Sequence, residues 1–248
     1  MFDQEKSTRA CVSLTCGRPF LVEASARVAT VVSSHAWSSD GVAPPSVVHL
    51  SAGERARLAE QWTHMGQMEH ASIAAFARFS LQLLALGAPP DLVDACTRAL
   101  ADETAHTKLC FAFASTYAGR PLGPGPLDIA HSLDVTALCD VVDLVIAEGC
   151  FGETSAALQA LEAADSAEDP AVVAAYTLIA SDEQRHAELA FRFVRWALEQ
   201  DRAVAARVEL AIGPETPAAD PAARAVALPC LQALLDSVRS PVQSSRAA

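Results

Sequence analysis

The sequence predicts an all-α fold, and three observations lead to that prediction. Ala and Leu are abundant, whereas only 11 of the 248 residues are Gly and 6% are aromatic, a balance that favours packed helices over strands and turns. Apolar residues recur at helical spacing along four long segments. Gly and Pro residues gather between those segments rather than inside them. With 51% hydrophobic residues, the chain is long enough to build a large helical core.

Charge and composition exclude several classes of function. Thirty acidic residues against eighteen basic ones give a net charge of −12, which repels nucleic acid and anionic membrane surfaces. No apolar run reaches the roughly 20 residues that span a bilayer, and the N-terminus does not resemble a secretory signal, so we expect a cytoplasmic protein without membrane or nucleic-acid partners. The seven Cys residues form no C-x-x-C pair, which argues against a disulfide framework or a zinc knuckle.

The first fifty residues predict an irregular N-terminal arm (1–50). Pro44 and Pro45 interrupt it, and no helical period is sustained, although a short strand fits within 21–32. The character of the chain changes at Ser51, which forms a predicted capping box with Glu54. We therefore place the first helix at about 51–86, ending at Gly87.

Three further helices follow from similar start and stop signals. The second is predicted from Asp91 to about Tyr117, and the Gly- and Pro-rich stretch 119–132 after it is long enough to cross over along the bundle. The third is predicted over about 134–164 and the fourth over about 170–199. These helices define a four-helix domain (51–200), and the Pro- and Ala-rich C-terminal extension (201–248) is expected to add short outer helices.

Each predicted helix carries a carboxylate within its apolar stripe. Glu69 shares the face of Met65 and Ile73 on the first helix. The second and fourth helices carry Glu and His three residues apart, on one face, and the third carries one Glu in its stripe. These residues are Glu103, His106, Glu183, His186 and Glu148.

Four carboxylates and two imidazoles at one level of an apolar core require positive charge. Unpaired buried carboxylates cost several kcal/mol each. Two divalent cations would balance four carboxylates, and Glu and His are ligands that iron or manganese accepts. The two Asp-Glu-x-x-His motifs also lie at the same distance after Pro90 and Pro170, which suggests two related helical hairpins.

This pattern resembles that of the ferritin-like di-iron carboxylate superfamily over about 51–199. The resemblance implies a ferritin-like four-helix bundle with a crossover between its second and third helices, and a site for two iron ions, with manganese as the alternative. It also implies that Glu103 and Glu183 bridge the two ions and that Glu69 and Glu148 bind at the ends. The two His residues would each bind one ion.

The third-helix ligand is ambiguous, because Glu153 also follows an apolar stripe. On an α-helix Glu148 and Glu153, five residues apart, cannot face the same point. The spacing to Pro170 favours Glu148, since it matches the spacing from Glu69 to Pro90. Both carboxylates remain candidates. Nearby Gly149 and Gly152 predict a π-bulge, a close helix approach or space for a reactant.

Three other residues are candidates for supporting roles. By the resemblance, Asp102 and Asp182 would accept the distal N–H of a ligand His across the bundle. Tyr176, two turns before Glu183, is a candidate redox-active or hydrogen-bonding residue, with a core aromatic as the alternative. His70 is expected to pack beside the site rather than to bind metal.

The expected function is that of a di-iron oxidoreductase. It would react with dioxygen or peroxide and oxidise a small substrate, with an external electron donor if it is an oxygenase. Iron storage or ferroxidase activity, peroxide scavenging, and a metal-free helical bundle are the alternatives. The arm and the extension favour a monomer or dimer over a closed cage.

Overall fold

The computed structural model describes residues 17–37, 43–213 and 220–239, and it confirms the all-α prediction. Helix α1 (Ala52–Ala85) and helix α2 (Pro90–Ala118) form an antiparallel hairpin, the most extensive helix pair of the molecule. Both lie within one to two residues of the predicted bounds. The capping box is present, because Ser51 Oγ accepts a hydrogen bond from Glu54 N and the Glu54 carboxylate accepts one from Ser51 N.

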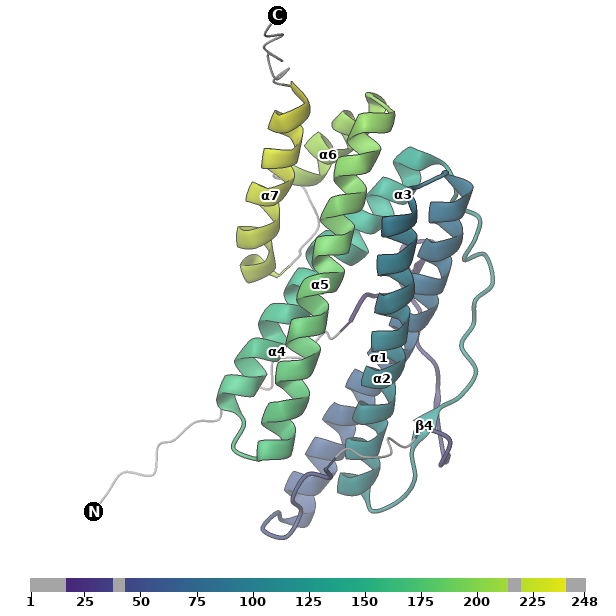
Figure 1. The fold of residues 1–248 in the computed structure, drawn as a ribbon. Coiled ribbons are helices and arrows are strands. Elements are labelled where there is room, and N and C mark those ends of the chain that lie inside the picture. Colours follow the sequence, from purple (N-terminus) through teal and green to yellow (C-terminus); the bar gives the residue numbers. More distant parts are fainter. Residues whose placement is uncertain (1–16, 38–42, 214–219, 240–248) are drawn as a thin grey trace, which may run out of the picture.

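The segment after α2 runs the length of the bundle, as Figure 1 shows at its right-hand edge. Gly119 ends α2 in the left-handed conformation, and the third helix begins at Leu138 rather than near 134. The short strand β4 (Gly123–Pro124) within this crossover pairs antiparallel with β3 (Val31–Val32) of the N-terminal arm. No sequence pattern predicted that pairing.

The predicted third helix is one continuous rod with a π-helical centre. It consists of α3 (Leu138–Val145), the π-helix η1 (Ile146–Glu153) and α4 (Thr154–Ser166). Two of the three explanations for the glycines are therefore realised together. The segment is π-helical, and it approaches α5 so closely that a Cβ atom on Gly149 would lie 2.6 Å from Cβ of Ala190.

Gly149→Ala is expected to destabilise the protein by about 1–3 kcal/mol, because the added methyl group overlaps the Ala190 side chain in a packed core. Gly53→Ala is the matched control, since nothing lies within 4 Å of its Cβ position in the first turn of α1. That control is expected to stabilise the helix by about 0.5–1 kcal/mol. Urea denaturation of both variants measures the difference, and equal effects would contradict the close approach.

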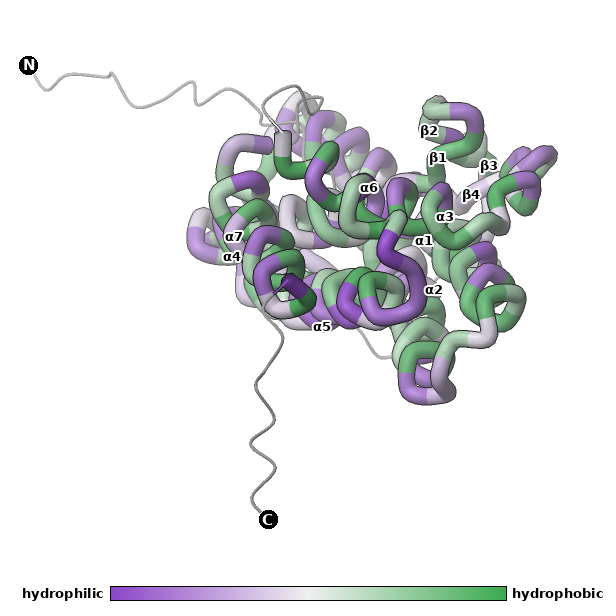
Figure 2. Tube along the Cα trace, turned by 90° about the horizontal axis from the view of Figure 1, so that it is seen from above, coloured by the Kyte–Doolittle hydropathy of each residue, from purple (hydrophilic) through white to green (hydrophobic). Residues whose placement is uncertain are grey.

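Helix α5 (Pro170–Gln200) completes the bundle of α1, α2, α5 and the continuous rod α3–η1–α4, viewed from above in Figure 2. Asp169 caps α5 by accepting hydrogen bonds from the backbone N–H groups of Ala171 and Val172. Helices α6 (Ala203–Ile212) and α7 (Pro221–Arg239) pack outside this bundle, against α3, η1, α4 and α5. None of the described helices is both long and apolar enough to cross a membrane.

The described part of the N-terminal arm packs against the bundle. Strand β1 (Leu21–Val22) forms a tight hairpin with β2 (Ser25–Ala26), within the range in which the sequence allowed a strand. Phe20 and Val22 are buried together with Ala71 and Ala75 of α1. Residues 20–22 of the arm therefore form an outer layer over α1.

Candidate metal centre

The bundle core brings two groups of four ligand-type side chains together. In each group one potential ligand atom per residue lies within 4.8 Å of the others. Glu103 and Glu183 belong to both groups. Glu69 and His106 complete the first group, and Glu153 and His186 complete the second. The six residues are called the carboxylate cluster below.

The two imidazoles are oriented in the same way. Nδ1 of His106 faces the cluster, 3.4 Å from Oε2 of Glu69, and Nδ1 of His186 lies 3.1 Å from Oε1 of Glu103. Both Nε2 atoms point outward to the Asp of the opposite motif: His106 Nε2 lies 2.9 Å from Asp182 Oδ2, and His186 Nε2 lies 3.3 Å from Asp102 Oδ2. An Nε2–H donated to Asp leaves Nδ1 as a lone-pair donor toward the cluster.

Arg185 holds the two outer carboxylates. Its guanidinium lies 2.7 Å from Asp182 and 3.2 Å from Asp102, so one half-exposed cation bridges both Asp residues. This bridge fixes the two imidazoles indirectly, because each Asp contacts one of them. Arg185 was not among the predicted site residues, although its position between Glu183 and His186 was the available signal.

The cluster is buried, and most of its carboxylate oxygens have no hydrogen-bond partner among the described residues. All four Glu side chains are 0% exposed. Among the described residues, no hydrogen-bond partner reaches either oxygen of Glu69, Glu103 and Glu153, one oxygen of Glu183, or Nδ1 of His106. Buried oxygens without partners are costly and rare, so their convergence from four helical segments fits a bound cation.

Burial and neighbouring charges shift the pKa values of Glu69, Glu103, Glu153 and the two His residues in the protein without metal. Burial and the neighbouring carboxylates raise the pKa of Glu69 and of Glu153 well above the usual value. Burial also opposes charge on Glu103, but the two imidazoles beside it hold its pKa below the ordinary range. Burial lowers the pKa of both His residues, and their Asp and Glu neighbours outweigh it, so the pKa values end well above 6.5.

The sequence favoured Glu148 over Glu153 as the third-helix ligand, and the structure places the two carboxylates differently. Glu153 lies in the cluster, whereas the Glu148 carboxylate accepts hydrogen bonds from Arg78 at 2.5 and 2.6 Å. Arg18 Nε lies 3.3 Å from the same carboxylate, and the backbone N–H of Leu21 donates to it at 3.0 Å. Two buried cations thus neutralise Glu148.

The π-helix explains why both acids are buried. Its hydrogen bonds join residues five positions apart, so Glu148 and Glu153 lie almost above one another along the rod instead of on different faces. On the α-helix expected from the sequence, the two side chains would lie on different faces. Arg78 was the missed signal, because an arginine in an apolar stretch of α1 needs a buried acid as its partner.

The remaining candidates lie outside the carboxylate cluster. Tyr176 is buried, stacks on Trp62 at a ring separation of 5.0 Å, accepts a hydrogen bond from Gln61 and donates one to Met65 Sδ. These contacts are those of a core aromatic residue. His70 packs edge-on against Trp37 of the arm, and burial lowers its pKa.

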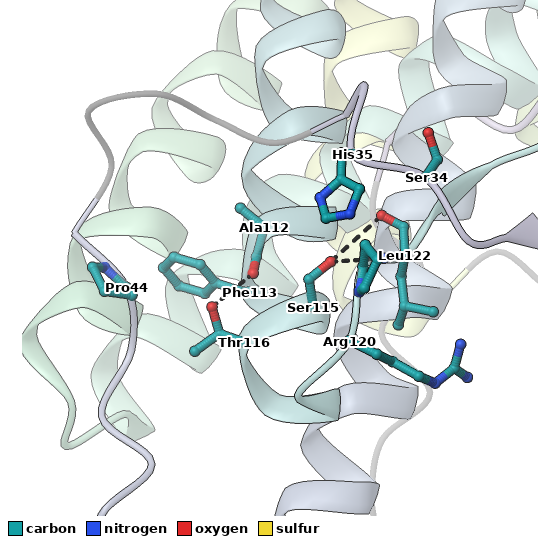
Figure 3. Close-up of a pocket in the computed structure, with 10 residues that line it drawn as sticks. Ser34, His35, Pro44, Ala112, Phe113, Ser115, Thr116, Arg120 and Leu122 are labelled. Atoms are coloured by element: carbon teal, nitrogen blue, oxygen red, sulfur yellow. Dashed lines mark hydrogen bonds between the residues drawn. The ribbon is translucent and has the colours of Figure 1, made fainter.

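A surface pocket of about 450 Å³ lies between the arm and the end of α2 (Figure 3). Its polar lining includes Ser115, Thr116 and Arg120, and no cluster residue lines it. Phe113 forms part of the wall and packs against Trp62, which separates the pocket from Tyr176.

No family model, curated protein or solved structure matches this chain.

Proposed function

We propose that this protein is a ferritin-like di-iron carboxylate oxidoreductase, with manganese as the alternative metal. The observation that carries the proposal is the pair of ligand groups that share Glu103 and Glu183. Two cations bound side by side need two shared carboxylates and separate ligands at each end, which matches that arrangement. The second and fourth helices contribute the two Glu-x-x-His motifs, as in the resemblance drawn from the sequence.

The donor set suits iron. Carboxylate oxygens and imidazole nitrogens bind both Fe(II) and Mn(II), and the hard oxygen donors favour the oxidised state of iron. Described side chains supply four Glu and two His and no Cys to the cluster, which argues against a zinc thiolate or an iron–sulfur site. Bound iron would supply redox chemistry with dioxygen or peroxide.

The surrounding residues have defined tasks in this proposal. Asp182 and Asp102 hold the tautomer of the two imidazoles, so that Nδ1 faces the metal position. The apolar core around the cluster excludes bulk water and so strengthens every electrostatic contact inside it. Raised pKa values let Glu69 and Glu153 carry protons until metal displaces them.

Burial of the cluster also supports a second candidate function. Side chains of the cluster are at most 2% exposed, which suits reactants as small as dioxygen, peroxide or an iron ion. Ferroxidase or peroxide-scavenging activity would need no pocket for an organic substrate. Turnover of Fe(II) or peroxide without any added organic substrate would favour this function over an oxygenase.

The test is an anaerobic Fe(II) titration of the purified chain, followed by exposure to air. We expect about two iron ions per chain and near-ultraviolet absorption of Fe(III) that develops only after oxygen is admitted. Elemental analysis of the protein as isolated separates iron from manganese. Absence of stoichiometric metal under both conditions would leave the metal-free helical bundle as the remaining explanation.

Asp182→Asn is expected to weaken metal binding by about 10–100-fold, because Asn can present its N–H₂ group to His106 Nε2 and favour the wrong tautomer. Competition with a chelator measures the change in affinity. Asp236→Asn, at an exposed site on α7, is the control and should leave the affinity unchanged. Equal affinities of the Asp182 variant and the unchanged protein would remove Asp182 from this role.

Without metal, the protein is expected to lose stability as the pH rises. Because these pKa values are raised, the folded state binds more protons than the unfolded state. For Glu69 and Glu153 the difference begins above pH 4.5, and for the two His residues it begins above pH 6.5. The free energy of unfolding therefore falls with increasing pH through those raised values. Bound metal reverses the trend, because its affinity rises as protons leave the ligands. Thermal melts at several pH values, with and without metal, measure both slopes.

A further inference from the structure

Residues 17–22 of the N-terminal arm, called the strap below, lie directly against the carboxylate cluster. Gly17 adopts a φ of +76°, and a Cβ atom there would clash with Ser72 Oγ and lie 3.2 Å from Glu69 Oε2. The Ser72 hydroxyl donates a hydrogen bond to the carbonyl of Arg18 at 2.8 Å. The start of the strap therefore touches both a cluster carboxylate and the helix that carries it.

The strap also contacts the π-helix opposite α1. Pro19 lies against Gly152, whose Cβ position is 3.0 Å from Pro19 Cδ. The bundle packs α1 on α2, α2 on α5, and η1 and α4 on α5, so the side between α1 and η1 is left to another element. The strap lies along that side, with contacts to Glu69 and Ser72 on α1 and to Gly152 on η1.

Buried charges fasten the strap. The Arg18 side chain is 2% exposed and enters the core with its guanidinium over the rings of Phe76 and Phe79, at 5.1 and 4.7 Å. It meets Glu148, which also accepts the Leu21 N–H. Arg78 of α1 completes the arrangement by donating to Glu148 and to the Leu21 carbonyl at 2.6 Å.

We propose that Arg18, Arg78 and Glu148 form a latch that holds the strap over the carboxylate cluster. The strap thereby covers the side of the cluster that lies between α1 and η1. This inference rests on the proposed function. Glu148 is then a positioning residue and no metal ligand. The latch joins the strap to α1 and η1, the elements that carry Glu69 and Glu153, and so restrains both carboxylates and the path by which ions leave.

The first test measures release of metal. Arg18→Met keeps the length and apolar stem of the side chain and leaves Glu148 paired with Arg78. We expect this variant to bind about two Fe(II) ions anaerobically but to release them to a chromogenic chelator at least about tenfold faster. Arg207→Met, which breaks a more exposed pairing with Asp140 and Asp143, is the control. An unchanged release rate in Arg18→Met would overturn the latch.

The second test needs no metal. Hydrogen exchange followed by mass spectrometry of the metal-free protein should show about tenfold faster exchange over residues 17–22 in Arg18→Met, and unchanged exchange in α6. Should that variant not fold, Gly17→Ala displaces the strap through its clash with Ser72 and leaves the three latch side chains unchanged. Equal protection in variant and unchanged protein contradicts the latch. Failure of the unchanged protein to bind metal contradicts only the proposed function.

Discussion

Replacing Glu183 by Ala is expected to abolish binding of both metal ions, whereas replacing Glu153 by Gln removes about one of the two. Glu183 belongs to both ligand groups, so its loss removes one ligand from each group and leaves three carboxylates, which no longer balance the charge of two divalent ions. Glu153 belongs to one group only. Metal analysis after anaerobic loading, on protein of verified fold, gives the stoichiometry directly.

Two controls make this prediction specific. Glu188 lies on the exposed face of α5, so the Glu188→Ala variant should bind both ions. Glu148→Gln should also keep both, because the latch carboxylate points to Arg78 and not to the cluster. Loss of an ion in Glu148→Gln with full retention in Glu153→Gln would restore the assignment that the sequence favoured.

Glu148→Ala is expected to lower the free energy of unfolding of the metal-free protein by about 3–5 kcal/mol. The substitution leaves Arg18 and Arg78 as unpaired cations in the core, where both side chains are at most 4% exposed. For a chain of this size that loss corresponds to a fall in Tm of about 6–20 °C. Differential scanning calorimetry of the metal-free variant measures it.

Asp140→Ala provides the comparison for that stability loss. Asp140 pairs with Arg207 at the start of the same helical rod, but both side chains are substantially exposed, at 54% and 38%. Its removal should change stability by no more than about 0.5 kcal/mol. Similar losses in the two variants would mean that burial of the Glu148 pairs has no energetic importance.

The helices were predictable because local signals define them. Ser51 with Glu54, Gly119, and Pro170 after Asp169 mark helix ends through capping chemistry that depends only on neighbouring residues. The burial of the carboxylates and imidazoles was also predictable, since each lies in an apolar stripe with a fixed helical period.

The choice between Glu148 and Glu153 was not predictable from spacing. The number of residues between each Glu and the following proline, Pro90 or Pro170, is a guide only if both helical hairpins turn at the same distance from the cluster. Sixteen residues separate Glu69 from the end of α1 at Ala85, whereas thirteen separate Glu153 from the end of α4 at Ser166. The second hairpin therefore turns almost one helical turn sooner, and the π-helix adds a further change of register.

The strap was missed for a different reason. Its contacts join residues far apart in the sequence, and no periodic pattern marks a short irregular segment. Arg18 is one basic residue among eighteen, and only the three-dimensional position of Glu148 distinguishes it. Pairing of β3 with β4 belongs to the same class of long-range contact.

The wide separation of Arg18 and Glu148 has a consequence for the order of folding. These partners are 130 residues apart, so the strap emerges from the ribosome on the order of ten seconds before the π-helix that receives it. Contacts between residues so far apart in the sequence form late in folding, because closing the intervening loop costs entropy before the contacts compensate for it. The helices can therefore assemble before the strap docks, and under the proposed function a metal ion supplied at that stage would reach the carboxylate cluster before the strap covers it.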